Sequence, residues 1–181
     1  MSKLKGKDRA KASKKQRMQN KNSFFVRRKF LVSKIRKWDD PILKEVCDTV
    51  SEDEDVSSII KELKNILNAT KNGIGLAAPQ IGYKKSIFAI KMSKSSPVTI
   101  FINAEIINKS EETVLMNEGC LSYPNFYTEI ERASGITLKY TNEEGKVEEK
   151  EFSKLEARVI QHEYDHTLGV CLVGNDYYST N

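Results

Sequence analysis

The feature that most restricts the fold of this chain is a predicted helix near its end that carries both of its histidines. The helix has signals at each end: Ser153 and Glu156 form the pattern of an N-terminal capping box, and Gly169 lies where a helix would stop. The sequence therefore predicts a single helix over residues 154–168, about four turns long.

The two histidines, His162 and His166, are four residues apart and share one face of this helix. Leu155 and Val159 lie on the same face, which indicates that the imidazoles point into the core. The simplest interpretation is that both histidines are buried core residues without a further role. With Glu163, however, they form the pattern H-E-x-x-H, in which both imidazoles bind a metal ion and the glutamate acts as a base. We favour the metal site, because a chance match is improbable in a chain with only two histidines.

A metal ion at such a site needs a third protein ligand and keeps one position for water. Since there is no third histidine, the ligand must be a cysteine or a carboxylate. Cys120 lies among turn-forming residues in NEGCLSYP, and by itself it fits a ligand and a structural residue equally well. Cys47 and Cys171 lie in apolar stretches typical of small core residues. Three cysteines do not indicate a disulfide framework.

A third distinctive stretch is GIGLAAPQIG, from Gly73 to Gly82. It lacks the spacing of a dinucleotide-binding loop and the Lys-Ser/Thr pair of a P-loop, so it does not favour phosphate binding. Its glycines would let a substrate backbone approach closely, and Gln80 would offer an amide donor. A helix C-cap followed by a turn explains the stretch equally well when it is considered alone.

The patterns around these motifs predict an α+β fold. An amphipathic helix is expected within residues 52–70, with acidic residues at its start. Short strands are expected in KSIFAIK and PVTIFIN, an extended segment in EETVLMNEGCLSYP, and a β-hairpin from GITLKYT to KVEEKEF.

Charge is distributed unevenly along the 181 residues. Residues 1–37 contain fifteen of the thirty Lys and Arg residues and one acid, so the rest carries fifteen basic and twenty-four acidic residues, a net charge of −9. We expect a basic, disordered arm over residues 1–34 and one domain over residues 35–181. The arm is open to three interpretations: a targeting presequence, a tail that contacts RNA, or a tail without function.

The three motifs, in this order, resemble those of the peptide deformylase family. GIGLAAPQ is similar to the family's first motif, EGCLS to its second and QHEYDH to its third, and the resemblance extends from about Ile35 to Leu172. It implies a central metal-binding helix surrounded by antiparallel β-strands. The chain resembles the short forms found in phages and some organelles, with the basic arm added.

The resemblance implies a metal-dependent hydrolase that removes the N-formyl group from the formyl-methionine of nascent polypeptides and releases formate. It also implies one divalent metal ion, Fe2+ in vivo and replaceable by Zn2+, Ni2+ or Co2+. The positions that match the family's metal ligands are Cys120, His162 and His166.

Further site residues follow from the same resemblance. Glu163 matches the general base and acid, while Gln80 and the backbone N–H of Leu121 match the groups that hold the formyl oxygen. Arg132 is expected to pair with Glu118. The peptide is expected to bind to the backbone of Gly75, and its methionine side chain to enter a pocket formed by Ile74, Met116, Leu155 and Val159.

Two other functions fit part of the pattern. A zinc peptidase shares H-E-x-x-H but would not need Cys120, and a nucleic-acid-binding protein would hold a closed structural metal. For a deformylase, the expected partners are the formylated nascent peptide and, through the arm, the ribosome or RNA. No apolar run approaches the ~18 residues of a membrane span, so the expected location is the cytoplasm of a bacterial or phage-infected cell. Import into an organelle is expected instead if the arm is a presequence. We also expect a monomer.

Overall fold

The structure is a computed structural model that describes residues 3–172 and, within the first 27 residues, the side chains of 14, 16–21 and 23–27. The described residues form an α+β fold, as predicted. The α-helices are α1 (Lys3–Val32), α2 (Ser57–Ala69) and α3 (Lys154–Thr167), and two short 3-10 helices are η1 (Pro41–Lys44) and η2 (Ala78–Ile81). The strands are β1 (Gly75–Ala77), β2 (Ile87–Ile90), β3 (Thr99–Lys109), β4 (Thr113–Cys120), β5 (Tyr123–Ala133), β6 (Gly135–Thr141) and β7 (Val147–Ser153).

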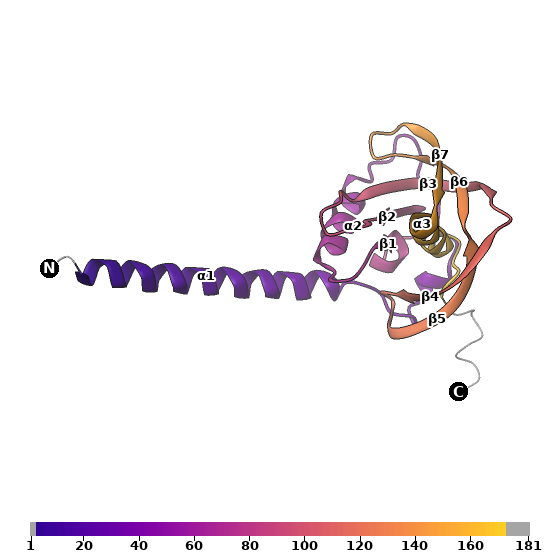
Figure 1. The fold of residues 1–181 in the computed structure, drawn as a ribbon. Helices are drawn as coiled ribbons and strands as arrows, with labels where there is room; N and C mark the ends of the chain where they lie inside the picture. Colours follow the sequence, from indigo (N-terminus) through magenta and orange to yellow (C-terminus); the bar gives the residue numbers. More distant parts are fainter. Residues whose placement is uncertain (1–2, 173–181) are drawn as a thin grey trace.

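The strands form two antiparallel sheets with α3 between them. Five strands lie in the order β1-β2-β3-β6-β7, and β4 pairs with β5 in a separate two-stranded sheet. Figure 1 shows α3 nearly end-on, with the larger sheet on one side of it and β4 and β5 on the other. The helix contacts strands of both sheets. This arrangement confirms the expected central helix surrounded by antiparallel strands.

The start of α3 differs from the predicted capping box. Ser153 is the N-cap residue, but its side chain makes no capping hydrogen bond. The chain passes from the last residue of β7 into the helix through Lys154, whose φ of 55° is left-handed and whose N–H donates to Ser134 O at 2.8 Å. The contact with the neighbouring strand end therefore fixes the start of the helix. Gly169 lies just past its end with a φ of 72°, as predicted.

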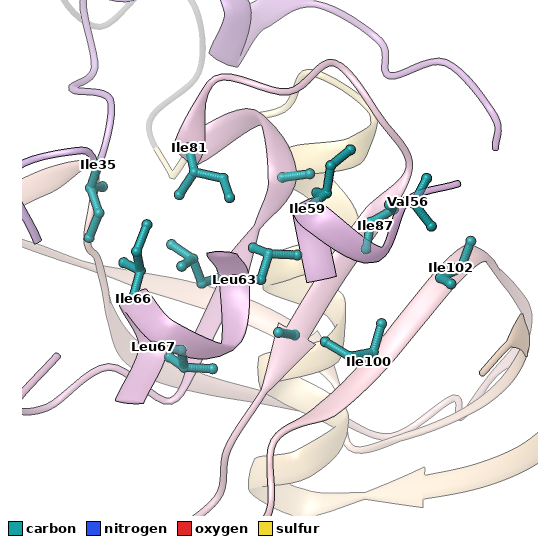
Figure 2. Packing of buried hydrophobic residues seen from close by; sticks show 13 residues of the cluster. Ile35, Val56, Ile59, Leu63, Ile66, Leu67, Ile81, Ile87, Ile100 and Ile102 are labelled. Atoms are coloured by element: carbon teal, nitrogen blue, oxygen red, sulfur yellow. The ribbon is translucent and has the colours of Figure 1, made fainter. Parts of the chain in front are cut away.

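The predicted amphipathic helix, α2, covers one face of the larger sheet and forms the main hydrophobic core. Its buried side chains are Ile59, Leu63, Ile66 and Leu67. Figure 2 shows them packed against Ile87 of β2 and Ile100 and Ile102 of β3. Each fully buried Leu or Ile stabilises the fold by about 1.5–3 kcal/mol. This core holds β1 and β2 rigidly behind the site described below.

The predicted hairpin is formed by β6 and β7. Gly145 has a φ of 79°, and Asn142 Oδ1 accepts hydrogen bonds from the backbone N–H groups of Glu144 and Lys146. The strand predicted in PVTIFIN is present but extends to Lys109. The segment EETVLMNEGCLSYP is extended as expected, in β4 and the start of β5, and a turn at Leu121 and Ser122 separates the two strands.

The first helix, α1, differs most from its prediction, because the segment expected to be disordered is helical over Lys3–Val32. Its Lys, Arg, Gln and Ala residues have high helix propensity, whereas the prediction relied on the missing apolar face. Figure 1 shows α1 projecting away from the rest of the molecule. Contact begins near its end, where Arg28 Nε donates to Ala69 O at 2.6 Å and Leu31 and Val32 pack against the core.

We call residues 3–27 the arm and residues 28–172 the body. No helix among the described residues is both long and apolar enough to cross a membrane. The residues after Leu172, on which the prediction of a short C-terminal form depends, lie outside the described residues.

Candidate metal centre and active site

Three potential metal ligands converge at the centre of the body. His162 and His166 project from α3, and Cys120 is the last residue of β4. The three ligand atoms all lie within 4.8 Å of one another, and Cys120 Sγ is 3.2 Å from His166 Nε2. The fold thus brings the predicted cysteine to the paired histidines across more than 40 residues of sequence.

A sharp turn after β4 holds Cys120 in place. The pairing of β4 with β5 shifts between Gly119 and Cys120, so that Cys120 pairs with Tyr123. The turn is anchored from outside, because Ser122 O accepts a hydrogen bond from Trp38 N at 3.1 Å. Across from Gly119 on β5, the ring of Tyr127 packs over this glycine, and a Cβ atom there would lie 2.6 Å from the ring.

A buried carboxylate orients His162. Glu118 Oε2 lies 2.9 Å from His162 Nδ1, and since an ionised carboxylate only accepts, Nδ1 carries the proton and Nε2 is free to bind a metal ion. Arg132 binds Glu118 through two nitrogens (2.6 and 3.0 Å), as expected, and Arg158 adds a third hydrogen bond (2.6 Å). Burial raises the pKa of Glu118, but the hydrogen bonds from His162 and Arg132 outweigh it and bring the pKa to about 2.

The donor set and its charges fit one divalent metal ion. Burial raises the pKa of the Cys120 thiol, yet the neighbouring imidazoles outweigh burial and hold the pKa well below its usual value. Burial lowers the pKa of His162, but Cys120 and Glu118 raise it to about 9. The cluster therefore favours a thiolate with a positive charge beside it, and a metal ion supplies that charge in place of the proton. Cysteine sulfur and histidine nitrogen are both zinc ligands, and three protein ligands leave a position open for water, as in catalytic sites.

Glu163 lies beside this cluster with an unpaired oxygen. Its side chain is only 4% exposed, and Oε2 has no hydrogen-bond partner among the described residues. Burial raises the pKa of Glu163 to about 7. A Cβ atom at Gly75 would lie 2.1 Å from Glu163 Oε1. The prediction attributed this glycine to the approach of a substrate, and the structure adds that the glycine makes room for the Glu163 carboxylate.

Gln80 presents its amide group to the cluster. The backbone N–H of Ala77 donates to Gln80 Oε1 at 2.8 Å, which turns the NH2 group toward the site. Gln80 Nε2 then donates to Cys120 Sγ (3.3 Å) and to Ser122 Oγ (3.1 Å). The amide is thus fixed next to the sulfur, where the sequence predicted a hydrogen-bond donor.

A cavity of about 490 Å³ opens beside the cluster. His162, Glu163, Cys120 and Gln80 line it, together with Leu121. The five residues predicted to bind the peptide also line this cavity: Ile74, Gly75, Met116, Leu155 and Val159. Val159 is buried, whereas Met116 and Leu155 are about half exposed at its mouth. The structure therefore brings every predicted site residue except His166 to the wall of one pocket, and His166 lies directly behind it.

Comparison with known proteins decides the family. The family described as polypeptide deformylase matches residues 32–175 of the chain. The peptide deformylase of Pseudothermotoga lettingae is 45% identical over 144 residues, which cover 79% of this chain and 82% of that protein. The chain belongs to the polypeptide deformylase family. The peptide deformylase of a Synechocystis species is 37% identical over 138 residues, covering 74% of this deformylase and 73% of its relative.

Solved structures agree with this membership. The crystal structure of peptide deformylase from Thermotoga maritima has a TM-score of 0.71 at 37% identity, and the match covers 76% of this chain and 92% of that one. A probable peptide deformylase from synechococcus phage S-SSM7 has a TM-score of 0.72 at 33% identity, covering 80% and 98%. Nothing in these comparisons favours the alternatives of a zinc peptidase or a nucleic-acid-binding protein.

Two charged residues around the site of this deformylase, Arg158 and Asp165, were not assigned to the site from the sequence. Arg158, one turn before His162 on α3, binds Glu118 and also donates to the carbonyls of Ile130 and Val114, so it joins α3 to both strands of the smaller sheet. Its spacing of four residues from a histidine was the signal available. Asp165 accepts a hydrogen bond from Arg132 at 2.8 Å. The Asp165 carboxylate and the Arg132 guanidinium therefore form a salt bridge.

Proposed function

We propose that this deformylase holds one metal ion with Cys120, His162 and His166 and uses Glu163 to transfer protons while it removes the formyl group from formyl-methionine. The observation that carries this assignment is the group of three ligand atoms within 4.8 Å of one another, beside a buried Glu163 oxygen that has no hydrogen-bond partner in the described part of the chain. The activity itself is the one that membership of the family gives to the chain.

The metal ion is Fe2+ in this proposal, and Zn2+, Ni2+ or Co2+ can replace it, since a thiolate with two imidazoles suits all four. When bound, the ion supplies a Lewis acid that makes a water molecule nucleophilic near neutral pH. Cys120 and the two histidines bind it through Sγ and Nε2 atoms, and Glu118 keeps the His162 ring in the required tautomer.

Glu163 carries the proton. In its ionised form it removes a proton from the attacking water, and in its protonated form it returns that proton to the leaving amine. A pKa of about 7 supports this role, because both forms are then accessible near neutral pH. The oxygen without a partner, Oε2, is free to accept the proton.

The formyl oxygen gains negative charge in the transition state. The amide N–H of Gln80 and the backbone N–H of Leu121 stabilise that charge, in a site where little rearrangement is needed. The fixed orientation of the Gln80 amide, held by the N–H of Ala77, supports this assignment.

The substrate peptide lies in the cavity as an extended strand. Gly75 offers its backbone to the peptide, and the methionine side chain enters the apolar part formed by Ile74, Met116, Leu155 and Val159. An apolar wall with a few polar groups at one end is typical of small-ligand sites.

Formate release tests this proposal. The full chain, purified without oxygen and loaded with Fe2+, Co2+ or Zn2+, is given formyl-Met-Ala-Ser and, separately, the same peptide without the formyl group. We expect formate from the first and no cleavage of the second. Cleavage of internal bonds in the unformylated peptide, without formate release, would instead identify a peptidase.

We further propose that the arm binds RNA, such as the surface of a ribosome, in the cytoplasm of a bacterial or phage-infected cell. The described arm side chains are exposed, and the arm holds ten Lys and Arg residues and one acid, while the body is acidic. Such a charge distribution binds phosphates without reading sequence. Phe24 and Phe25, both exposed among the basic residues, would stack on unpaired bases.

Removal of residues 1–26 tests the arm while keeping Arg28 on the body. We expect the shortened chain to lose co-sedimentation with ribosomes at low salt, and the full chain to lose it as salt is raised. Equal binding by both chains would rule out the RNA role. Import of a fused reporter into an organelle would support the presequence instead. We propose that the full chain and the shortened chain are both monomers, and light scattering tests this by measuring the molar mass of each.

A further inference from the structure

One exposed charge in the wall of the active-site cavity has no role in the function proposed above. The Lys, Arg and Glu residues that line the cavity are Lys37, Glu118, Arg158 and Glu163. Glu118 and Arg158 are buried and hydrogen-bonded to each other, and Glu163 carries the proton. The remaining residue, Lys37, is exposed and lies on the segment between α1 and η1. Its charge is therefore available to a molecule that enters the cavity.

Lys37 differs from the two basic residues next to it in the sequence, because both of those have a carboxylate partner. Lys34 Nζ lies 2.6 Å from a Glu62 oxygen, and Arg36 Nη1 lies 3.5 Å from an Asp40 oxygen. Lys37 forms no salt bridge within the part of the chain that the structure describes, and its Nζ donates to a backbone carbonyl instead. A carbonyl carries no net charge, so the positive charge of Lys37 is not neutralised.

The carbonyl that accepts from Lys37 belongs to Leu121, and it places the charge beside the path of the peptide. The distance from Lys37 Nζ to Leu121 O is 3.1 Å. A Cβ atom at Gly73 would lie 3.1 Å from the Leu121 side chain, whereas one at Gly75 would lie 2.1 Å from Glu163 Oε1. The stretch from Gly75 back to Gly73 thus leads from the proposed proton carrier to Leu121. Since an extended peptide advances about 3.3 Å per residue, its second and third residues reach this end of the stretch.

We propose that Lys37 determines specificity by favouring an acidic side chain in the two residues that follow formyl-methionine. This inference rests on the proposed function, which places the extended peptide in the cavity. An ammonium group has three N–H donors, and only one of them is used by Leu121. The others can donate to a carboxylate of the peptide, in a hydrogen bond between opposite charges.

The contact should act on binding and not on the chemical step. Lys37 lies away from the formyl carbon, so it would stabilise the bound substrate and the transition state to the same extent. Such uniform binding lowers KM and leaves kcat unchanged. The preference for an acidic peptide should therefore appear in KM.

Pairs of amidated peptides test the inference. The full chain, loaded with Co2+, is given formyl-Met-Asp-Ser-amide or formyl-Met-Asn-Ser-amide, and then formyl-Met-Ala-Asp-amide or formyl-Met-Ala-Asn-amide. The amide removes the terminal carboxylate, so the members of a pair differ in one side-chain charge. In at least one pair we expect kcat/KM to be about threefold higher for the Asp peptide, because an exposed ion pair has a modest effect. The ratio should approach one in about 0.5 M salt.

Charge variants assign this ratio to one residue. Lys37→Gln should bring the Asp to Asn ratio to about one, and Lys37→Glu should bring it to about one third, because the new carboxylate repels the peptide. Lys34→Gln is the matched control, since it removes the same charge three residues away from a side chain that pairs with Glu62. Lys34 does not line the cavity, so its variant should keep the ratio of the unchanged chain.

Three outcomes would overturn the role of Lys37. The first is formate release at equal kcat/KM from both members of each pair, which leaves the proposed function intact. The second is a ratio that Lys37→Gln does not change, even where kcat/KM falls equally for both peptides, because the lysine would then only hold the Leu121 turn. The third is an equal decrease of the ratio in Lys34→Gln, which would indicate the total charge of the segment. Formate from none of the four peptides would contradict the proposed function itself, and this inference with it.

Discussion

The body and the arm of this deformylase use charged residues in opposite ways. In the body, the buried carboxylate of Glu118 accepts hydrogen bonds from Arg132 and Arg158, and it holds His162 in place. The arm holds ten basic residues and one acid on one helix, and its described side chains are exposed. In the body, each charged side chain therefore acts through its particular hydrogen-bond partners, whereas in the arm the total positive charge of the helix matters. Changes in the body should therefore have large local effects, and changes in the arm small ones that depend on salt.

The largest effect is expected at Glu163. Glu163→Gln keeps the shape of the side chain but removes the group that accepts the proton, so kcat/KM for a formylated peptide should fall about 10³-fold. Steady-state formate release at saturating metal measures this effect. A decrease of less than tenfold would show that another group carries the proton.

A smaller but still large effect is expected at Gly75. In Gly75→Ala the new Cβ would lie 2.1 Å from Glu163 Oε1, so the carboxylate must move, and a displaced catalytic group costs about 10²-fold in rate. Gly135→Ala is the matched control, because its Cβ would meet nothing closer than 3.6 Å. Equal formate release by both variants would contradict the close packing of Glu163 on β1.

Glu118 should make the stability of the body sensitive to acid. Its folded pKa of about 2 is below the unfolded value of 4.5, so its contribution is present above pH 4.5 and is lost as the pH falls toward 2. The loss is on the order of 3 kcal/mol. Urea unfolding of the metal-free chain between pH 6 and pH 3 should show about 2 kcal/mol of this loss, since the rest is lost below pH 3. Glu118→Gln should show a flatter pH dependence, and parallel curves would contradict the assignment.

The smallest effect is expected from the arm. Removal of residues 1–26 should change kcat/KM for a tripeptide by less than about twofold, because surface changes away from a site have small effects. Val32, which lines the cavity, stays in the shortened chain. A large loss of peptide turnover would contradict this separation of roles between body and arm, because the arm would then support the catalytic site directly.

The sequence predicted the parts of the site that depend on local spacing. Two histidines four residues apart on a helix must share a face, whatever surrounds them. Cys120 was different, because the residues around it were compatible with a metal ligand and with a structural cysteine equally well. Only the resemblance to the family assigned Cys120 to the site. The amphipathic helix α2 and the hairpin from β6 to β7 were also local patterns, and both are present.

Contacts between distant segments could not be predicted in the same way. The Ser153 side chain makes no capping hydrogen bond, and the N–H of Lys154 instead donates to Ser134 O, in the bend between β5 and β6. The hydrogen bond from the Cys171 thiol to Leu43 O, across 128 residues of sequence, depends on how the chain folds back past η1. The helix in the arm was missed for another reason, since propensity was given less weight than the absence of an apolar face.

The central claim is that Cys120 and the two histidines bind one ion beside Glu163. Titration of the metal-free chain with Co2+ tests it most directly, because a bound thiolate gives a sulfur-to-cobalt absorption band. We predict one equivalent of Co2+ with this band in the unchanged chain, and no such band in Cys120→Ala. A band of equal intensity in Cys120→Ala would contradict the account.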